Sequence, residues 1–155
     1  MDFSRLNRSE LVGFVGAAVL FLSLFLPWFA TKEDSLGEIN GAPAPDGLNA
    51  FGVFGSLDWL LVAACTAPFI LAYIIVRGHE LSWRPGEITM IVGMIAFALI
   101  LLNGVILGKP GEPPSESTRE IGWYVGLLGS VLLMAGGFIR QGEGGRTRKP
   151  PGSVG

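Results

Sequence analysis

The stretch FLSLFLPWFATKED, residues 21–34, decides the class of this protein. An apolar run ends at Pro27 and Trp28, and an acidic segment follows within a few residues. A cleaved signal peptide would need a short apolar region and small residues before its cleavage site, whereas this run is long and contains Trp28. We therefore expect an uncleaved membrane helix over residues 11–29 that ends near Pro27, with Trp28 at the depth of the lipid headgroups.

Three further segments have the length of a membrane helix: residues 57–76, 88–107 and 121–139. A hydrocarbon core about 30 Å thick needs roughly 20 apolar residues in a helix. Half of the 155 residues are hydrophobic and only 15% are charged, compared with about 25% charged residues in an average soluble protein. The sequence therefore predicts an all-α membrane protein, with a four-transmembrane-helix bundle over residues 1–140 and a disordered, basic Gly/Pro-rich tail over residues 141–155.

Residues at the predicted helix ends fit these bounds. Ser117 and Glu120 have the spacing of a capping box that would open the fourth helix, and Ser56 is expected to cap the second. Every tryptophan lies near a predicted helix end, which is typical of the aromatic belts at the two membrane surfaces. The expected belts contain Trp28, Trp59 and Trp123 on one surface and Trp83 on the other.

The basic residues predict the orientation of the chain in the cell membrane. Two outer loops hold Lys32, Lys109 and Arg119, whereas the remaining loop and the two terminal segments hold eight basic residues. Those eight are Arg5, Arg8, Arg77, Arg84, Arg140, Arg146, Arg148 and Lys149. Because Lys and Arg are enriched in cytoplasmic loops, we expect a multi-pass protein with both its N-terminus and its C-terminus in the cytoplasm.

The first outer loop, residues 30–55, is the longest predicted connection between helices. Its second half is apolar and Gly-rich, and we expect it to lie along the outer membrane surface with Phe51 and Phe54 pointing inward. A re-entrant segment is the alternative. The two halves of the chain also align weakly, which makes them candidates for a 2+2 repeat of a helical hairpin.

Residues that could carry chemistry are sparse. No predicted helix has an ionisable residue at mid-depth, where proton relays and ion sites of membrane proteins usually lie. The single histidine, His79, and the single cysteine, Cys65, have no second metal ligand near them in sequence. We therefore predict no enzyme activity, no catalytic residue, no metal and no cofactor, and the small net charge of −2 gives no reason to expect nucleic acid.

Two polar residues within the predicted helices are candidates for a polar cavity. Asn103 lies about one turn from the outer end of the third helix, and Thr66 lies near the middle of the second. The amide of Asn103 is expected to bond a neighbouring helix or interfacial water, with contact to a substrate as the alternative. The hydroxyl of Thr66 can instead bond the backbone of its own helix.

Small residues recur every four positions on the fourth predicted helix, at Gly122, Gly126 and Ser130. Such a face lets two helix backbones approach closely. We expect it to pack against another helix of the same chain, most simply the first or the third. The alternative is that this face docks a partner, either another membrane protein or a second copy of the chain.

The chain resembles small four-helix integral membrane proteins of unknown function from actinobacteria and related high-GC bacteria. The resemblance rests on FLPWF at the end of the first helix, LDW and GWY at the start of the second and fourth, and the basic tail. It implies no activity and no functional residue. The favoured hypothesis is a non-catalytic accessory subunit or scaffold of a cell-envelope complex. The alternative is a small transporter or lipid-binding bundle, and the basic tail is expected to contact anionic lipid.

Overall fold

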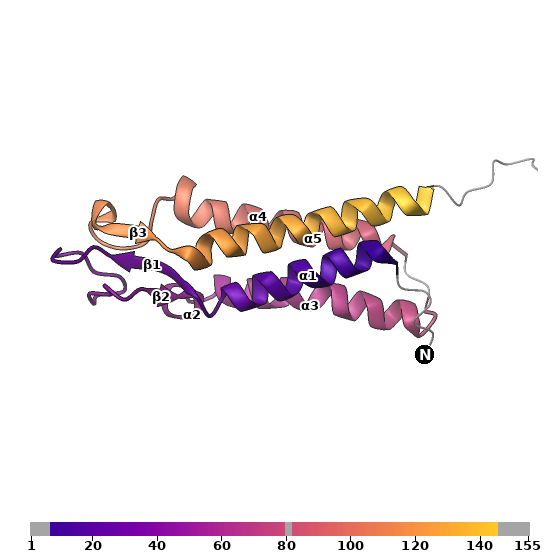
Figure 1. Ribbon diagram of the computed structural model, residues 1–155, viewed down its shortest axis with the longest axis horizontal. Coiled ribbons are helices and arrows are strands. Elements are labelled where there is room, and N and C mark those ends of the chain that lie inside the picture. Colours follow the sequence, from indigo (N-terminus) through magenta and orange to yellow (C-terminus); the bar gives the residue numbers. More distant parts are fainter. Residues whose placement is uncertain (1–6, 80–81, 146–155) are drawn as a thin grey trace, which may run out of the picture.

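The computed structural model describes residues 7–79 and 82–145 as an elongated helical bundle with a small sheet at one end (Figure 1). Four helices run along its length: α1 (Arg8–Ser23), α3 (Leu57–Val76), α4 (Pro85–Leu101) and α5 (Ile121–Gly145). Both ends of the described chain lie at the end of the bundle opposite the sheet (Figure 1). We call that end the terminal end, and the end with the sheet the cap end.

Three helical segments are long and apolar enough to cross a membrane: Leu57–Val76, Gly86–Ile106 and Ile121–Glu143. Their length and composition are those of a membrane protein. Helix α3 has the predicted bounds, and α5 begins at the predicted residue. However, α5 continues through Gly145, so residues 141–145 are helical although the sequence placed them in the tail. The rest of the predicted tail, residues 146–155, lies outside the described residues.

The first predicted helix is wrong at both ends, because α1 begins at Arg8 and stops at Ser23. Asn7 and Glu10 form a capping box at its start, in which the side chain of Glu10 accepts the backbone N–H of Asn7 at 2.8 Å. Beyond Ser23 the chain makes a tight turn and enters strand β1 (Pro27–Thr31). The indole of Trp28 folds back, and its N–H donates at 2.6 Å to the carbonyl of Ser23, which also accepts the N–H of Leu26 at 3.1 Å.

The cap is a three-stranded antiparallel sheet that the sequence did not predict, so the protein is not purely α-helical. Strand β1 lies between β2 (Leu48–Asn49) and β3 (Ser117–Arg119), in the order β2-β1-β3. A four-residue helix, α2 (Ala50–Val53), follows β2, and a single 3₁₀ turn, Pro114–Glu116, precedes β3. The predicted capping box is wrong, because Ser117 lies in a strand paired with β1. Ser56 precedes α3 as predicted, but its side chain makes no hydrogen bond to the first turn of that helix.

The third predicted helix begins earlier and ends differently from the prediction. Helix α4 begins at Pro85 and is regular to Leu101, and a wide turn, Leu102–Ile106, then replaces its last predicted turn. The break occurs at Asn103 and Gly104, whose backbone angles are not helical, and Gly104 has φ +154°. That conformation favours glycine because it has no Cβ.

Helix α5 is the central element, and it packs closely on α1 and α4. A Cβ added at Gly129 would lie 2.5 Å from the backbone nitrogen of Leu20, and one added at Gly136 would lie 2.6 Å from that of Gly13. Helix α4 lies equally close, because a Cβ added at Gly93 of α4 would lie 2.5 Å from the backbone nitrogen of Met134. Helix α3 makes fewer contacts, and these are with α1 and α4.

The tryptophans divide into two pairs, which corrects the simple belt prediction. Trp28 and Trp123 are buried in the hydrophobic core, at 0% and 5% exposure, whereas Trp59 and Trp83 are 66% and 60% exposed. Only the exposed pair is placed to meet lipid headgroups. Trp28 instead fills the space between β1 and the glycines at the start of α5.

This difference predicts the fluorescence response to lipids that carry bromine near the headgroup. Replacing Trp59 with Phe should lower the fraction of tryptophan fluorescence that the lipids quench, because Trp59 is exposed at the start of α3. Replacing the buried Trp28 with Phe should raise that fraction, because it removes a protected emitter. Equal changes in the two variants would contradict the placement of Trp28 in the core.

Candidate functional site

The predicted small-residue face of α5 is covered by the chain itself. Gly122, Gly126 and Ser130 are all buried. A Cβ added at Gly126 would lie 2.8 Å from Cζ2 of Trp28 and 3.2 Å from the hydroxyl of Ser23. The indole of Trp28 therefore lies against these glycines where α1 gives way to β1. In the structure this face therefore packs against residues of the same chain, and its three small residues are covered.

The structure does not bring the two predicted cavity residues together. Asn103 borders a cavity of about 370 Å³ at the cap end, between the start of α3 and the loop after α4. Its amide N–H donates to the carbonyl of Leu99 at 3.2 Å, so it bonds its own helix rather than a neighbour. Thr66 does not line that cavity; it is exposed on α3 and donates to the carbonyl of Ala63 at 2.8 Å.

A half-buried arginine holds the broken end of α4 in place. Arg119 of β3 donates two hydrogen bonds, at 2.8 and 2.6 Å, to the carbonyl of Gly104. Its guanidinium also lies 5.2 Å from the ring centre of Trp123, within the range of a cation–π contact. A Cβ at Gly104 would lie 2.5 Å from Nε1 of Trp123, so only glycine fits there. From the sequence, Arg119 was expected only to contribute a loop charge.

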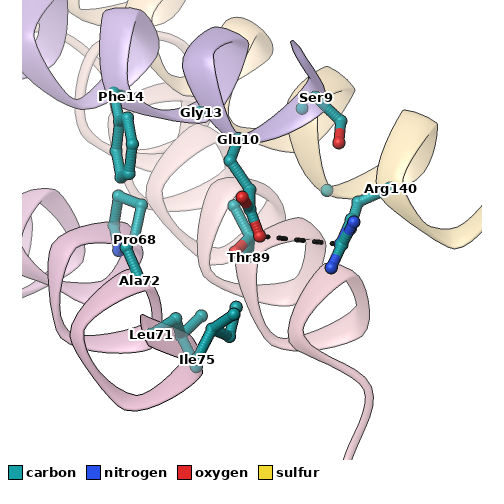
Figure 2. Close-up of a pocket in the computed structure, with 12 residues that line it drawn as sticks. Ser9, Glu10, Gly13, Phe14, Pro68, Leu71, Ala72, Ile75, Thr89 and Arg140 are labelled. Atoms are coloured by element: carbon teal, nitrogen blue, oxygen red, sulfur yellow. Dashed lines mark ion pairs between the residues drawn. The ribbon is translucent and has the colours of Figure 1, made fainter. Parts of the chain in front are cut away.

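The second polar cluster lies at the terminal end, where all four long helices meet around one small pocket (Figure 2). Glu10 of α1 faces Arg140 of α5 across it, with Oε1 of Glu10 3.6 Å from Nε of Arg140. These side chains are 11% and 24% exposed, so the ion pair is largely removed from water. Glu10 is fixed on its other side, because Oε2 accepts the N–H of Asn7.

A second carboxylate completes this cluster. Oε2 of Glu143 accepts hydrogen bonds from the hydroxyl of Ser9 at 2.7 Å and from the amide of Asn7 at 3.3 Å. It also lies 3.9 Å from Nη1 of Arg140. Arg140 thus lies between two carboxylates from different helices, and the cluster ties the start of α1 to the end of α5.

The pocket inside this cluster has a volume of about 20 Å³, which is room for about one water molecule. Oε1 of Glu10 accepts no hydrogen bond from the described residues, so a water would find an acceptor there. Its other walls are mostly apolar and include Phe14, Pro68 and Leu71, which Figure 2 shows opposite the charged pair. The space is too small for an organic substrate, and the arrangement fits a structural ion pair.

The ion pair between Glu10 and Arg140 was not predicted from the sequence. There, Glu10 was expected to complement the helix dipole, and Arg140 was one of the basic residues expected in the cytoplasm. One signal was available, because the two opposite charges lie near the same end of the first and fourth predicted spans. Helices that share an end bring such residues to the same depth, where pairing lowers the cost of burying each charge.

The described residues offer no further grouping of catalytic or metal-binding side chains. Within residues 7–79 and 82–145, no three His, Cys, Asp or Glu side chains come together as a metal site requires. Comparisons with protein-family models, with curated proteins and with solved structures find no match to this chain.

Proposed function

We propose that α1 is a fourth membrane crossing, which makes the protein a four-helix multi-pass membrane protein. Its 16 residues span about 24 Å at 1.5 Å per residue, a few Å less than the hydrocarbon core. A mismatch of this size costs only fractions of a kcal/mol per Å, and the apolar turn over residues 24–26 extends the span. Large apolar side chains are exposed along α1, as expected of a lipid-facing helix: Leu11, Val15, Phe21 and Leu22.

We infer that the terminal end faces the cytoplasm and that the membrane is the cell membrane. Arg8, Arg77 and Arg84 are exposed at this end, in agreement with the excess of basic residues in cytoplasmic loops. Exposed carboxylates gather in the segments of the cap end: Glu33, Asp34, Glu38, Asp46 and Glu112. The orientation predicted from the sequence also counted Arg140 and four basic residues that lie outside the described residues: Arg5, Arg146, Arg148 and Lys149.

The 2+2 repeat stays a prediction. The two hairpins it would relate pack differently, since α4 lies close against α5 while α1 and α3 are less closely joined. The same is true of anionic-lipid contact by the tail, whose basic residues are not described.

The function that the geometry supports best is a non-catalytic accessory subunit or scaffold of a cell-envelope complex. The observation that carries this proposal is the cap, which joins chain segments from both halves of the protein. The N–H of Lys32 donates to the carbonyl of Glu116 at 2.8 Å, and that of Glu120 donates to the carbonyl of Trp28 at 2.8 Å. These bonds hold together the segments of the cap, whose exposed carboxylates form an acidic surface. We place this surface outside the bilayer, where it suits docking of another envelope protein.

Affinity purification of the full chain from its native membranes in mild detergent tests this role. We expect a stoichiometric envelope protein to co-purify and to be lost when Glu33 and Asp34, which are exposed in the cap loop, are both replaced with Lys. Charge reversal of Arg84 at the terminal end is the matched control and should keep the partner. Purification of the chain alone under every mild condition would contradict the scaffold role.

A lipid-binding role is the second candidate function. It is favoured by the cavity beside Asn103, which opens at the cap end between two helices that are only loosely packed.

A further inference from the structure

Two cavities lie one above the other along the seam between α3 and α4. The cavity at the cap end is lined by Leu57 and Asn103. The second, also about 370 Å³, is lined by Leu60 and Leu99, which lie one helical turn deeper on the same two helices. The two cavities thus occupy successive levels of the same seam, and we call them together the seam groove.

The seam groove has a physical cause in the small side chains that line it. Ala63 and Ala64 of α3 face Ala96 of α4 across it, and these side chains cannot fill the space between the two helices. Glycine brings α4 and α5 into backbone contact elsewhere, but no such contact closes the seam. An empty groove of this size within a membrane would forfeit packing contacts along its whole length, so lipid or protein must occupy it.

The chemistry of the groove changes with depth in the way an amphiphile requires. At the cap end, the lining includes the polar side chains of Ser56, Asn103 and Lys109. One turn deeper, the lining is entirely apolar and includes Val92 and Ile95. A membrane helix of a partner would be apolar throughout its middle and would leave the polar end unmatched.

The charge at the polar end favours an anionic headgroup. The ammonium of Lys109 donates to the carbonyl of Ser117, and no carboxylate of the described residues pairs with it. The N-terminus of α3, which begins at Leu57 beside this cavity, adds its partial positive charge. Asp58, in the first turn of α3, is buried away from the cavity and accepts the N–H of Trp59.

We propose that the seam groove binds an anionic glycerophospholipid from the membrane leaflet at the cap end. Its phosphate lies beside Lys109 and Asn103, and one acyl chain lies along Ala63, Ala64 and Ile95. The inference deepens the lipid-binding candidate and rests on membrane insertion of α3 and α4. It does not depend on whether α1 crosses the bilayer, or on a protein partner for the cap.

Native mass spectrometry of the full chain in mild detergent tests the site, with phosphatidylglycerol and phosphatidylcholine as paired probes. Wild type should retain phosphatidylglycerol in preference. Replacing Lys109 with Gln should lower that preference about fivefold, the effect of roughly one basic contact, while Lys109→Arg should keep it. Ala63→Leu should fill the apolar part and reduce retention of both lipids.

Matched controls separate the groove from the general membrane surface. Lys32→Gln removes an exposed cap lysine, and Ala18→Leu enlarges an exposed alanine on α1; both should behave as wild type. Equal retention in wild type, Lys109→Gln and Ala63→Leu would overturn the proposal, because the lipid would then be unspecific. A loss of preference in Lys109→Arg would also overturn it, as would displacement of a bound protein, rather than lipid, by Ala63→Leu.

Discussion

Replacing Gly129 with Ala should destabilise the folded protein by roughly 1–3 kcal/mol, the usual cost of an overfilled core. The added Cβ would lie 2.5 Å from the backbone nitrogen of Leu20 and 2.8 Å from its Cα. Backbone atoms cannot move aside as a flexible side chain can, so α1 and α5 would have to separate. The loss should appear despite the gain of about 1 kcal/mol that Ala brings over Gly within a helix.

Gly142 provides the matched control on the same helix. A Cβ at Gly142 would meet nothing within 4 Å, so Gly142→Ala should be neutral or slightly stabilising. Thermal unfolding of both variants in mild detergent, followed by near-UV circular dichroism, measures the difference. Identical melting temperatures for the two variants would show that α1 does not lie in backbone contact with α5.

Replacing Arg140 with Met should destabilise the protein by about 3 kcal/mol, the low end of the range for breaking a buried ion pair. The low end applies because Arg140 is 24% exposed and its nearest distance to Glu10 is 3.6 Å. The change leaves the carboxylates of Glu10 and Glu143 close together without their shared cation. Exposed Arg84, which pairs with no carboxylate of the described residues, is the control, and Arg84→Met should have little effect.

A double variant distinguishes charge from packing at this cluster. Glu10→Gln in the Arg140→Met background removes the unpaired buried charge, so it should restore part of the lost stability. Chemical unfolding in a denaturing detergent gives the free energies for the cycle. Additive losses would mean that Glu10 and Arg140 do not interact in the folded protein.

The helices were predictable where an apolar run is bounded by polar residues on both sides. Helix α3 is the clearest case, since its predicted and observed bounds agree. The end of α1 was not predictable in this way, because the apolar residues after Ser23 enter a strand instead of continuing the helix. An apolar run alone does not distinguish a helix from a short strand.

The cap could not be predicted because its partners are far apart in sequence. Thr118 bonds the carbonyl of Ala30, 88 residues away, and strands of two to five residues are too short for a clear alternating pattern. The buried indole of Trp28 has the same origin, since its environment is built by β1 and by glycines of α5.

Of the candidate sites, the small-residue face was predictable because helical spacing places Gly122 and Gly126 on one side of α5. The pairing of Asn103 with Thr66 failed because sequence spacing gives no relation between residues on different helices. The break at Gly104 rotates the end of α4, and Thr66 faces outward on α3. The Glu10–Arg140 pair was missed because each charge had a sufficient explanation within its own helix.

Side-specific cysteine labelling tests the central claim, that α1 crosses the membrane and both ends of the bundle are exposed on opposite sides. Single cysteines at Arg8 and at Leu36, which is 95% exposed, would be introduced after replacing Cys65 with Ala. With an impermeant maleimide on intact cells, Leu36→Cys should react at once and Arg8→Cys only after permeabilisation. Labelling of both positions from the same side would contradict the four-span account.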